Sequence, residues 1–263
     1  MKLKAFTVPL VLLSHGTLMP MQARAATLLA SYGAFEKTDV HKSFYKFEVA
    51  QDKGGLGDFE LASLNHIDEK TIRDSIEFVS RGLGFDFEPV RLHLDLGYMF
   101  SIDKFALDEI DYGISRSVLG AGLKLDLGFL QLRGFSRSYV PYGSAKTRID
   151  SFTLTFNPYP YQQSQAGIAL RVGFLEVEAD AGRFDKLRGR YDILGQNYRI
   201  DLPGVTYAKA AVVLKGNKHS MLRLEAHKVL EDHGRREEFH KLIGSAMHRD
   251  AYDGGSLGIG FEF

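Results

Sequence analysis

The sequence predicts an all-β fold in which antiparallel strands close into one transmembrane barrel of about twelve strands. Three observations favour this fold class. Apolar and polar residues alternate in segment after segment, every second connection between segments is short, and the chain ends in an alternating segment with a terminal Phe263. A sheet with open edges would leave backbone hydrogen-bonding groups unsatisfied in lipid, so the sheet is expected to close.

The alternation is clearest in residues 118–134. From Leu119 to Leu127 leucine and alanine occupy one side, while glycine, lysine and aspartate occupy the other. A period of two is typical of a strand with one apolar and one polar face. The alternation resumes after Gly128 and continues through Arg133. This pattern predicts an antiparallel hairpin with a tight glycine turn.

Twelve segments of this kind are expected to be strands. They cover residues 27–36, 43–51, 57–66, 74–87, 90–102, 112–127, 129–140, 163–172, 174–184, 204–215, 219–232 and 254–263. The short connections are residues 52–56, 88–89, 128, 173 and 216–218. Short turns at one end and long loops at the other are typical of transmembrane β-barrels.

Residues 142–162 leave the strand number open. Phe152, Leu154 and Phe156 alternate with threonines as in a further strand, but the following PYPYQQSQ breaks the pattern. An even number of strands would then require another strand at residues 191–200. The alternative to twelve strands is therefore fourteen, and ten is the other even number considered.

The first 25 residues have the pattern of an export signal. Lys2 and Lys4 precede an apolar core, and a small-x-small site ends at Ala25. The sequence thus predicts a signal peptide at residues 1–25, cleaved near Ala25, and one mature barrel domain at residues 26–263.

Composition argues against several other classes of protein. The chain has 33 Lys and Arg against 33 Asp and Glu, so it offers no basic field for nucleic acid. It has no cysteine, which excludes disulfides and thiolate metal sites. No segment offers about 18 to 20 continuous apolar residues for a membrane-spanning helix. The runner-up class is an exported β-sandwich binding module.

The last eight residues, SLGIGFEF, resemble the C-terminal assembly signal of bacterial outer-membrane proteins. The side that carries this resemblance consists of Leu257, Ile259, Phe261 and Phe263. The resemblance is to the class of outer-membrane barrels. It implies a location in the outer membrane of a Gram-negative bacterium and recognition by the barrel-assembly machinery. The expected surroundings are membrane lipid and lipopolysaccharide, and the expected state is a monomer.

The polar positions of the strands are the candidate lumen residues, because a transmembrane barrel turns its apolar side to lipid. They are Lys46, Glu48, Arg91, His93, Asp95, Lys124, Asp126, Arg133, Arg171, Glu176, Glu178, Asp180, Lys209, Arg223, Glu225, His227 and Glu262. A twelve-stranded barrel leaves room for a narrow pore. The charges either line this pore or pair across the lumen and plug it.

The expected function is a narrow channel for small hydrophilic solutes. The mixed charges predict no strong ion preference, although the acidic series from Glu176 to Asp180 would favour cations if no basic strand lay beside it. A plugged structural or surface-binding barrel and an outer-membrane lipid hydrolase are the alternatives.

No catalytic site, metal site or cofactor is expected. The histidines available to a hydrolase are His41 near Ser43, His219 next to Ser220, His227 near Glu225, and His233, His240 and His248.

Two further expectations concern a loop and the two faces of the barrel. Residues 231–250 form the most helix-like segment, whose Arg235, Arg236 and Lys241 could contact lipopolysaccharide phosphates. Arginine at the lipid-facing Leu94 or Leu125 should be costly, whereas the lumen positions Gly97 and Asp126 should tolerate it better.

Overall fold

The computed structural model describes residues 26–35, 44–51, 59–67, 71–105, 110–149, 152–202, 204–216, 219–231 and 254–262. These ranges contain sixteen strands. Within them, no helix is long and apolar enough to cross a membrane. The predicted signal peptide (1–25), most of the helix-like segment (231–250), His41, Ser43 and Phe263 lie outside the described residues.

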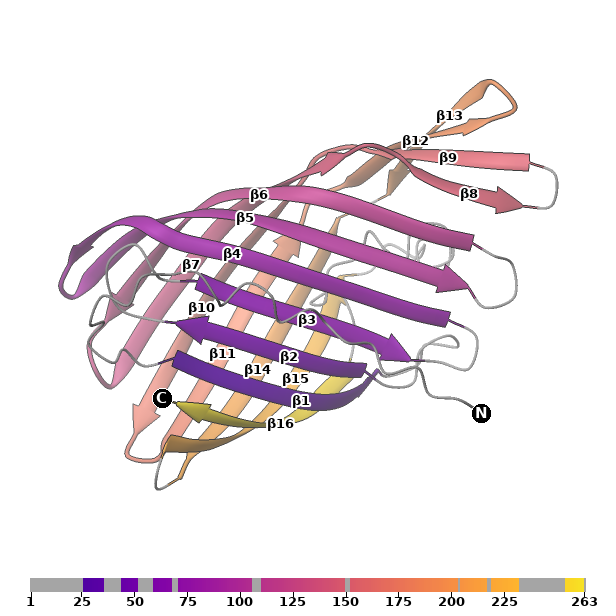
Figure 1. Ribbon diagram of the computed structural model, residues 1–263. Helices are drawn as coiled ribbons and strands as arrows, with labels where there is room; N and C mark the ends of the chain where they lie inside the picture. The colour runs from indigo at the N-terminus through magenta and orange to yellow at the C-terminus, as the bar shows by residue number, and fades with distance from the viewer. Residues whose placement is uncertain are drawn as a thin grey trace, which may run out of the picture.

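Twelve strands form a closed antiparallel barrel (Figure 1). They are β1 (Ala26–Phe35), β2 (Phe44–Gln51), β3 (Phe59–Ile67), β4 (Thr71–Phe87), β5 (Val90–Phe105), β6 (Ile110–Asp126), β7 (Leu130–Tyr142), β10 (Tyr161–Val172), β11 (Leu175–Phe184), β14 (Val205–Lys215), β15 (Ser220–Glu231) and β16 (Gly254–Glu262). The predicted fold class and its twelve strands are confirmed, and the observed bounds mostly lie within three residues of the predicted ones.

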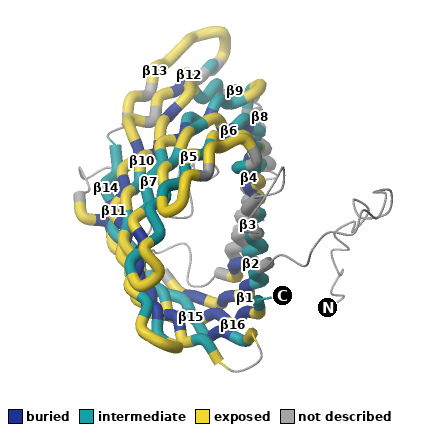
Figure 2. The backbone as a smooth tube through the Cα atoms, turned by 90° about the vertical axis from the view of Figure 1, so that its left-hand side faces the viewer, coloured by how far each residue is buried: buried dark blue, intermediate teal, exposed yellow. Residues whose placement is uncertain are grey.

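Each barrel strand pairs with its neighbours in chain order, and β1 closes the ring with β16. This closing pair runs from Thr27 opposite Glu262 to Phe35 opposite Gly254. Along the barrel axis the strands form an oval ring (Figure 2). Because every barrel strand has two partners, the ring has no open edge to expose to lipid.

The two ends of the barrel differ in their connections. At one end, here called the turn end, β4–β5, β6–β7 and β10–β11 are joined by residues 88–89, 127–129 and 173–174. Gly128 and Gly173 have positive φ angles of 80° and 59°, which glycine adopts without steric cost. The opposite end is called the loop end. The short turns predicted at residues 88–89, 128 and 173 are confirmed. The predicted alternation with long loops is wrong for β2 to β4, because residues 52–58 join β2 to β3 whereas only residues 68–70 join β3 to β4 at the loop end.

The two faces of the wall differ as predicted. On β11 the acidic Glu176, Glu178 and Asp180 are buried inside, whereas Val177 is exposed outside. On β5 the side chain of Leu94 is 50% exposed, next to Asp95 at 0%. Exposed large apolar side chains recur around the outer face, which is the surface expected where a barrel meets lipid.

Four further strands form a second sheet beyond the loop end (Figure 1). They are β8 (Ala145–Ile149), β9 (Phe152–Pro158), β12 (Leu187–Ile193) and β13 (Gln196–Leu202), in the order β13-β12-β9-β8. This sheet is called the wall extension below.

The wall extension continues the barrel wall in register. Strands β10 and β11 pair Gln163 with Phe184, and β9 and β12 pair Pro158 with Gly189. The two pairs are five residues apart on both sides of the ladder, so no residue is inserted between the barrel wall and its extension. Between the two ladders, the Tyr159 amide donates to the Arg188 carbonyl at 2.9 Å. Strands β12 and β13 likewise keep the register of β11 and β14.

The fourteen-strand alternative is therefore wrong, and so is the ten-strand one. Residues 152–158 and 187–202 do form strands, but they lengthen β10, β11 and β14 instead of adding new strands to the ring. A sequence pattern shows that a segment is extended, but it does not show which neighbour pairs with it.

Candidate functional site

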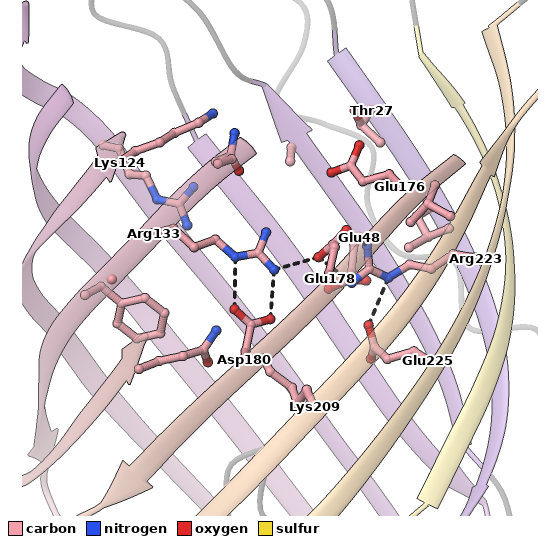
Figure 3. A pocket seen from close by; sticks show the side chains of 18 of the residues that line it. Thr27, Glu48, Lys124, Arg133, Glu176, Glu178, Asp180, Lys209, Arg223 and Glu225 are labelled. Carbon is pink, nitrogen blue, oxygen red and sulfur yellow. Dashed lines mark hydrogen bonds and ion pairs between the residues drawn. The ribbon is translucent and has the colours of Figure 1, made fainter. Parts of the chain in front are cut away.

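A cavity of about 420 Å³ lies inside the barrel, lined by residues from eleven of the twelve barrel strands. Since its lining comes from all around the ring, this cavity is the lumen itself. Figure 3 shows the side chains that line it, among them Thr27 of β1, Lys124 of β6 and Lys209 of β14. Most of these side chains are charged or polar, as the sequence predicted for this face.

Arg133 on β7 holds two acidic side chains of β11 (Figure 3). Its Nε donates to Asp180 Oδ1 at 3.0 Å, and its Nη2 donates to Asp180 Oδ2 at 2.8 Å and Glu178 Oε2 at 2.6 Å. Glu178 also accepts a hydrogen bond from Arg223 Nη1 at 2.7 Å. Two guanidinium groups therefore compensate the charge of one largely buried carboxylate.

The same series of ion pairs continues towards β2. Arg223 Nε donates to Glu225 Oε2 at 2.9 Å, and Lys46 Nζ donates to Glu225 Oε1 at 2.8 Å. Lys46 Nζ also lies 3.0 Å from Glu48 Oε2. The series thus extends along the wall from β7 through β11 and β15 to β2.

Further ion pairs of the same cluster lie nearer the turn end. Arg171 is 3.2 Å from Asp126 Oδ2 and 3.3 Å from Glu176 Oε2. Lys215 is 3.4 Å from Glu176 Oε2 and 3.3 Å from Glu262 Oε1. The acidic series of β11 was expected to favour cations only if no basic strand lay beside it. Basic residues flank all three of its acids, so that condition is not met.

Small residues allow these side chains to reach across an intervening strand. Gly167 of β10 lies opposite Arg133 on one side and Asp180 on the other. Ala211 of β14 lies between Glu178 and Glu225, the two carboxylates that Arg223 joins. Strands that flank a middle strand are roughly 9 to 10 Å apart, so a bulky side chain between them would separate the two charges.

A second cluster, on the wall of β4 to β7, is more deeply buried. Arg137 Nε donates to Asp95 Oδ2 at 2.6 Å, and Gly120 of β6 lies opposite both residues. His93 Nε2 is 3.3 Å from Asp95 Oδ1. The Tyr139 hydroxyl donates to Glu77 Oε1 at 3.0 Å. This cluster uses the same arrangement of acid, glycine and arginine as the pair around Gly167.

Four aromatic rings follow one another along the inner wall near the loop end. Tyr139 stacks on Tyr161 with ring centroids 4.8 Å apart, and Phe184 lies 6.4 Å from Tyr161 and 5.3 Å from Tyr207. Gln163 Nε2 donates to the Tyr207 hydroxyl at 2.6 Å. These buried rings therefore join the inner faces of four successive barrel strands, β7, β10, β11 and β14, near the loop end.

The structure brings the predicted lumen residues to the inner side of the wall. Cavity-lining or paired side chains on that side include His93, Asp95, Lys124, Asp126, Arg133, Arg171, Glu176, Glu178, Asp180, Arg223, Glu225 and His227. Arg91 lies opposite Lys124 in the ladder of β5 and β6, so it occupies the same face. Of the predicted assembly signal, Leu257, Ile259 and Phe261 are exposed on the outer face.

Sequence reasoning missed several buried polar residues of the inner wall. Glu77, Arg116 and Arg137 face inward and are almost fully buried, but none was named as a candidate. The spacing could have found two of them, because Arg137 is four residues from Arg133 and Arg116 is eight from Lys124. Serines and tyrosines on the outer face of these strands weaken the alternation of polar and apolar residues there.

The histidines considered for catalysis lie in different places. His227 Nε2 is 2.5 Å from Glu225 Oε1 inside the barrel, whereas His219 is at the turn end. His233, His240 and His248 lie outside the described residues. Within the described ranges, no group of three or more His, Cys, Asp or Glu residues is arranged to hold a metal ion.

No protein-family model and no curated protein matches the sequence. Solved structures do match the fold. They include the COG4313 outer membrane channel from Pseudomonas putida F1, with a TM-score of 0.53, 10% identity and coverage of 95% of this chain and 99% of that chain.

Two other matches have a TM-score of 0.50. The toluene transporter TbuX from Ralstonia pickettii is 9% identical, over 92% of this chain and 90% of that chain. The transport unit of the autotransporter AIDA-I from Escherichia coli is 11% identical, over 96% and 94%. The chain therefore has the fold of bacterial outer-membrane β-barrels.

Proposed function

We propose that this protein is an outer-membrane channel through which small hydrophilic solutes diffuse. The observation that carries the proposal is the lumen cavity of about 420 Å³, lined by polar side chains from eleven strands. Among proteins of similar fold are one described as an outer membrane channel and one described as a toluene transporter.

The path of the ion pairs favours a pore over a plug. The pairs described above join neighbouring strands or reach across one or two strands, as Lys46 of β2 does to Glu225 of β15. The opposite wall of a twelve-stranded ring is six strands away. Pairing along the wall therefore holds the charged groups beside the strands and does not draw opposite walls together.

The balance of charge bears on ion preference. Glu176, Glu178 and Asp180 are compensated by arginines and a lysine, so this series gives no net attraction for cations. A lumen of paired charges offers hydrogen bonds to a polar solute at many positions without a single strong binding site.

Single-channel recording in planar lipid bilayers tests the proposal. Folded protein, identified by its different migration on SDS gels before and after boiling, should give discrete current steps. Boiled protein at the same concentration is the control. Folded protein that produces no steps above the lipid background would contradict the channel and favour the plugged barrel.

A further inference from the structure

The charged residues of β12 and β13 lie on one side of the wall extension. Because β9, β12 and β13 continue the ladders of β10, β11 and β14 in register, their side-chain alternation continues that of the barrel wall. Arg188 and Arg190 therefore follow Asp180 and Phe184 on the lumen side. The alternate positions, from residue 187 to 193 and from 196 to 202, carry no charged residue.

Arginines dominate this lumen-side face. Arg188, Arg190 and Arg199 are exposed on β12 and β13, and the acidic residues there are Asp192 and Asp201. Among the described side chains on this face of β12 and β13, three arginines therefore stand against two aspartates.

Two of the arginines lie directly opposite each other. Arg190 of β12 pairs with Arg199 of β13 in the antiparallel ladder. Like charges at directly opposed positions destabilise a sheet, because their Cβ atoms are only about 5 Å apart. An anion between two guanidinium groups would remove this repulsion, and guanidinium binds carboxylate and phosphate through paired hydrogen bonds.

The hydrogen bond and ion pairs that these arginines make within the sheet leave them able to bind an anion. Arg190 Nε donates to the neutral Asn197 Oδ1 at 2.5 Å. Arg188 and Arg199 lie 3.6 and 3.9 Å from the single carboxylate of Asp201. Both ion pairs are solvent-exposed, so they hold the arginines only weakly.

We propose that Arg190 and Arg199, assisted by Arg188, form an anion-binding site that captures solutes carrying carboxylate or phosphate groups at the loop-end mouth, which faces the outside of the cell in barrels with short periplasmic turns. The inference rests on the proposed channel and names its substrate class. The site continues the lumen side of the wall and not the opposite side, which continues the apolar outer face of the barrel. A basic face at a channel mouth raises the local concentration of anions and their rate of entry.

Ion selectivity in planar bilayers is the first test. Under a KCl gradient, the reversal potential of the wild type should show preference for chloride over potassium. In R190Q/R199Q the permeability ratio should fall about twofold or more, because the two charges that focus anions at the mouth are gone. R183Q is the matched control, since Arg183 is an exposed arginine on the outward side of β11.

Binding of citrate to the detergent-purified barrel, measured by calorimetry, is a second test that does not require conduction. R190Q/R199Q should bind citrate roughly tenfold more weakly than the wild type, whereas R190K/R199K should retain part of the affinity and R183Q all of it. Heat-modifiability on SDS gels verifies that each variant is folded.

The two measurements separate the two proposals. Conduction with equal selectivity in wild type and R190Q/R199Q, or citrate affinity that is the same in both, would overturn the anion site and leave the channel standing. Citrate binding that depends on both arginines, in protein that conducts no current, would support the site and contradict the channel.

Discussion

At the scale of single residues, glycines on the lumen face decide which charges can meet. A Cβ added at Gly167 would lie 1.8 Å from Asp180 Oδ1 and 3.1 Å from the Ala179 carbonyl oxygen. The Arg133–Asp180 contact thus occupies the space above this glycine. Gly120 serves the same purpose for Asp95 and Arg137, since its Cβ would come within 2.9 Å of Arg137 Cγ.

Replacing Gly167 by alanine should displace Asp180 from Arg133 and lower the free energy of unfolding by about 1 to 3 kcal/mol, because the lumen wall becomes overpacked. Urea titration in lipid vesicles, followed by SDS gel migration, measures this change. Gly134→Ala is the control, since its Cβ would meet nothing closer than the Gln165 carbonyl oxygen at 3.3 Å. Equal stability of the two variants would mean that the pair does not depend on the glycine.

At the scale of elements, the barrel strands β10, β11 and β14, taken together with their continuations β9, β12 and β13, are longer than a membrane requires. A transmembrane β-strand needs about 9 to 11 residues. Strands β10 and β9 together run from Phe152 to Val172, interrupted only at residues 159–160. The additional length forms the wall extension, in which the lumen side stays polar and the other side carries no charge.

The outer face of each barrel strand should reject charge. Leu94→Arg on β5 should cost about 2 to 4 kcal/mol of stability, because the guanidinium would face hydrocarbon. Thr27→Arg, which places the same group in the lumen cavity, should cost less. Unfolding in vesicles compares the two variants, and equal costs would contradict the assignment of faces.

Gly97 is not the tolerant lumen position that alternation alone suggests. It does face inward, but a Cβ there would lie 2.1 Å from the Phe78 carbonyl oxygen of the neighbouring strand. The expectation that arginine is better tolerated at Gly97 is therefore wrong, because backbone cannot move aside as a flexible side chain can.

At the scale of the whole molecule, closure of the ring creates the lumen and sets its width. Twelve strands lie between the eight that fill with side chains and the sixteen that hold a wide water channel. The paired charges narrow this space further, and about 420 Å³ remains. A channel of this size should discriminate between solutes by their size.

Liposome swelling measures this discrimination. Vesicles containing the folded protein should swell rapidly in arabinose and much more slowly in the trisaccharide raffinose, since the larger sugar fits the lumen poorly. Protein-free vesicles provide the baseline for each sugar. Equal swelling rates in both sugars would show that the pore is wider than the cavity indicates.

The sequence by itself determined the barrel class, the positions of the barrel strands and the two faces of the wall, but it left fourteen and ten strands open as alternatives to twelve. These features follow from local alternation, as in Leu94 beside Asp95, because successive side chains of any strand point to opposite sides. The same alternation identified Arg133, Glu178 and Arg223 as lumen residues before their partners were known.

Only the tertiary structure decided which of these residues meet. Arg133 and Asp180 are far apart in the chain and come together because β10 lies between their strands with a glycine at that level. Whether residues 152–158 span the membrane or lengthen β10 was likewise open in the sequence. Pairing register is a property of two strands, so no single segment encodes it, and register is what places Arg190 opposite Arg199 on the lumen side of the mouth.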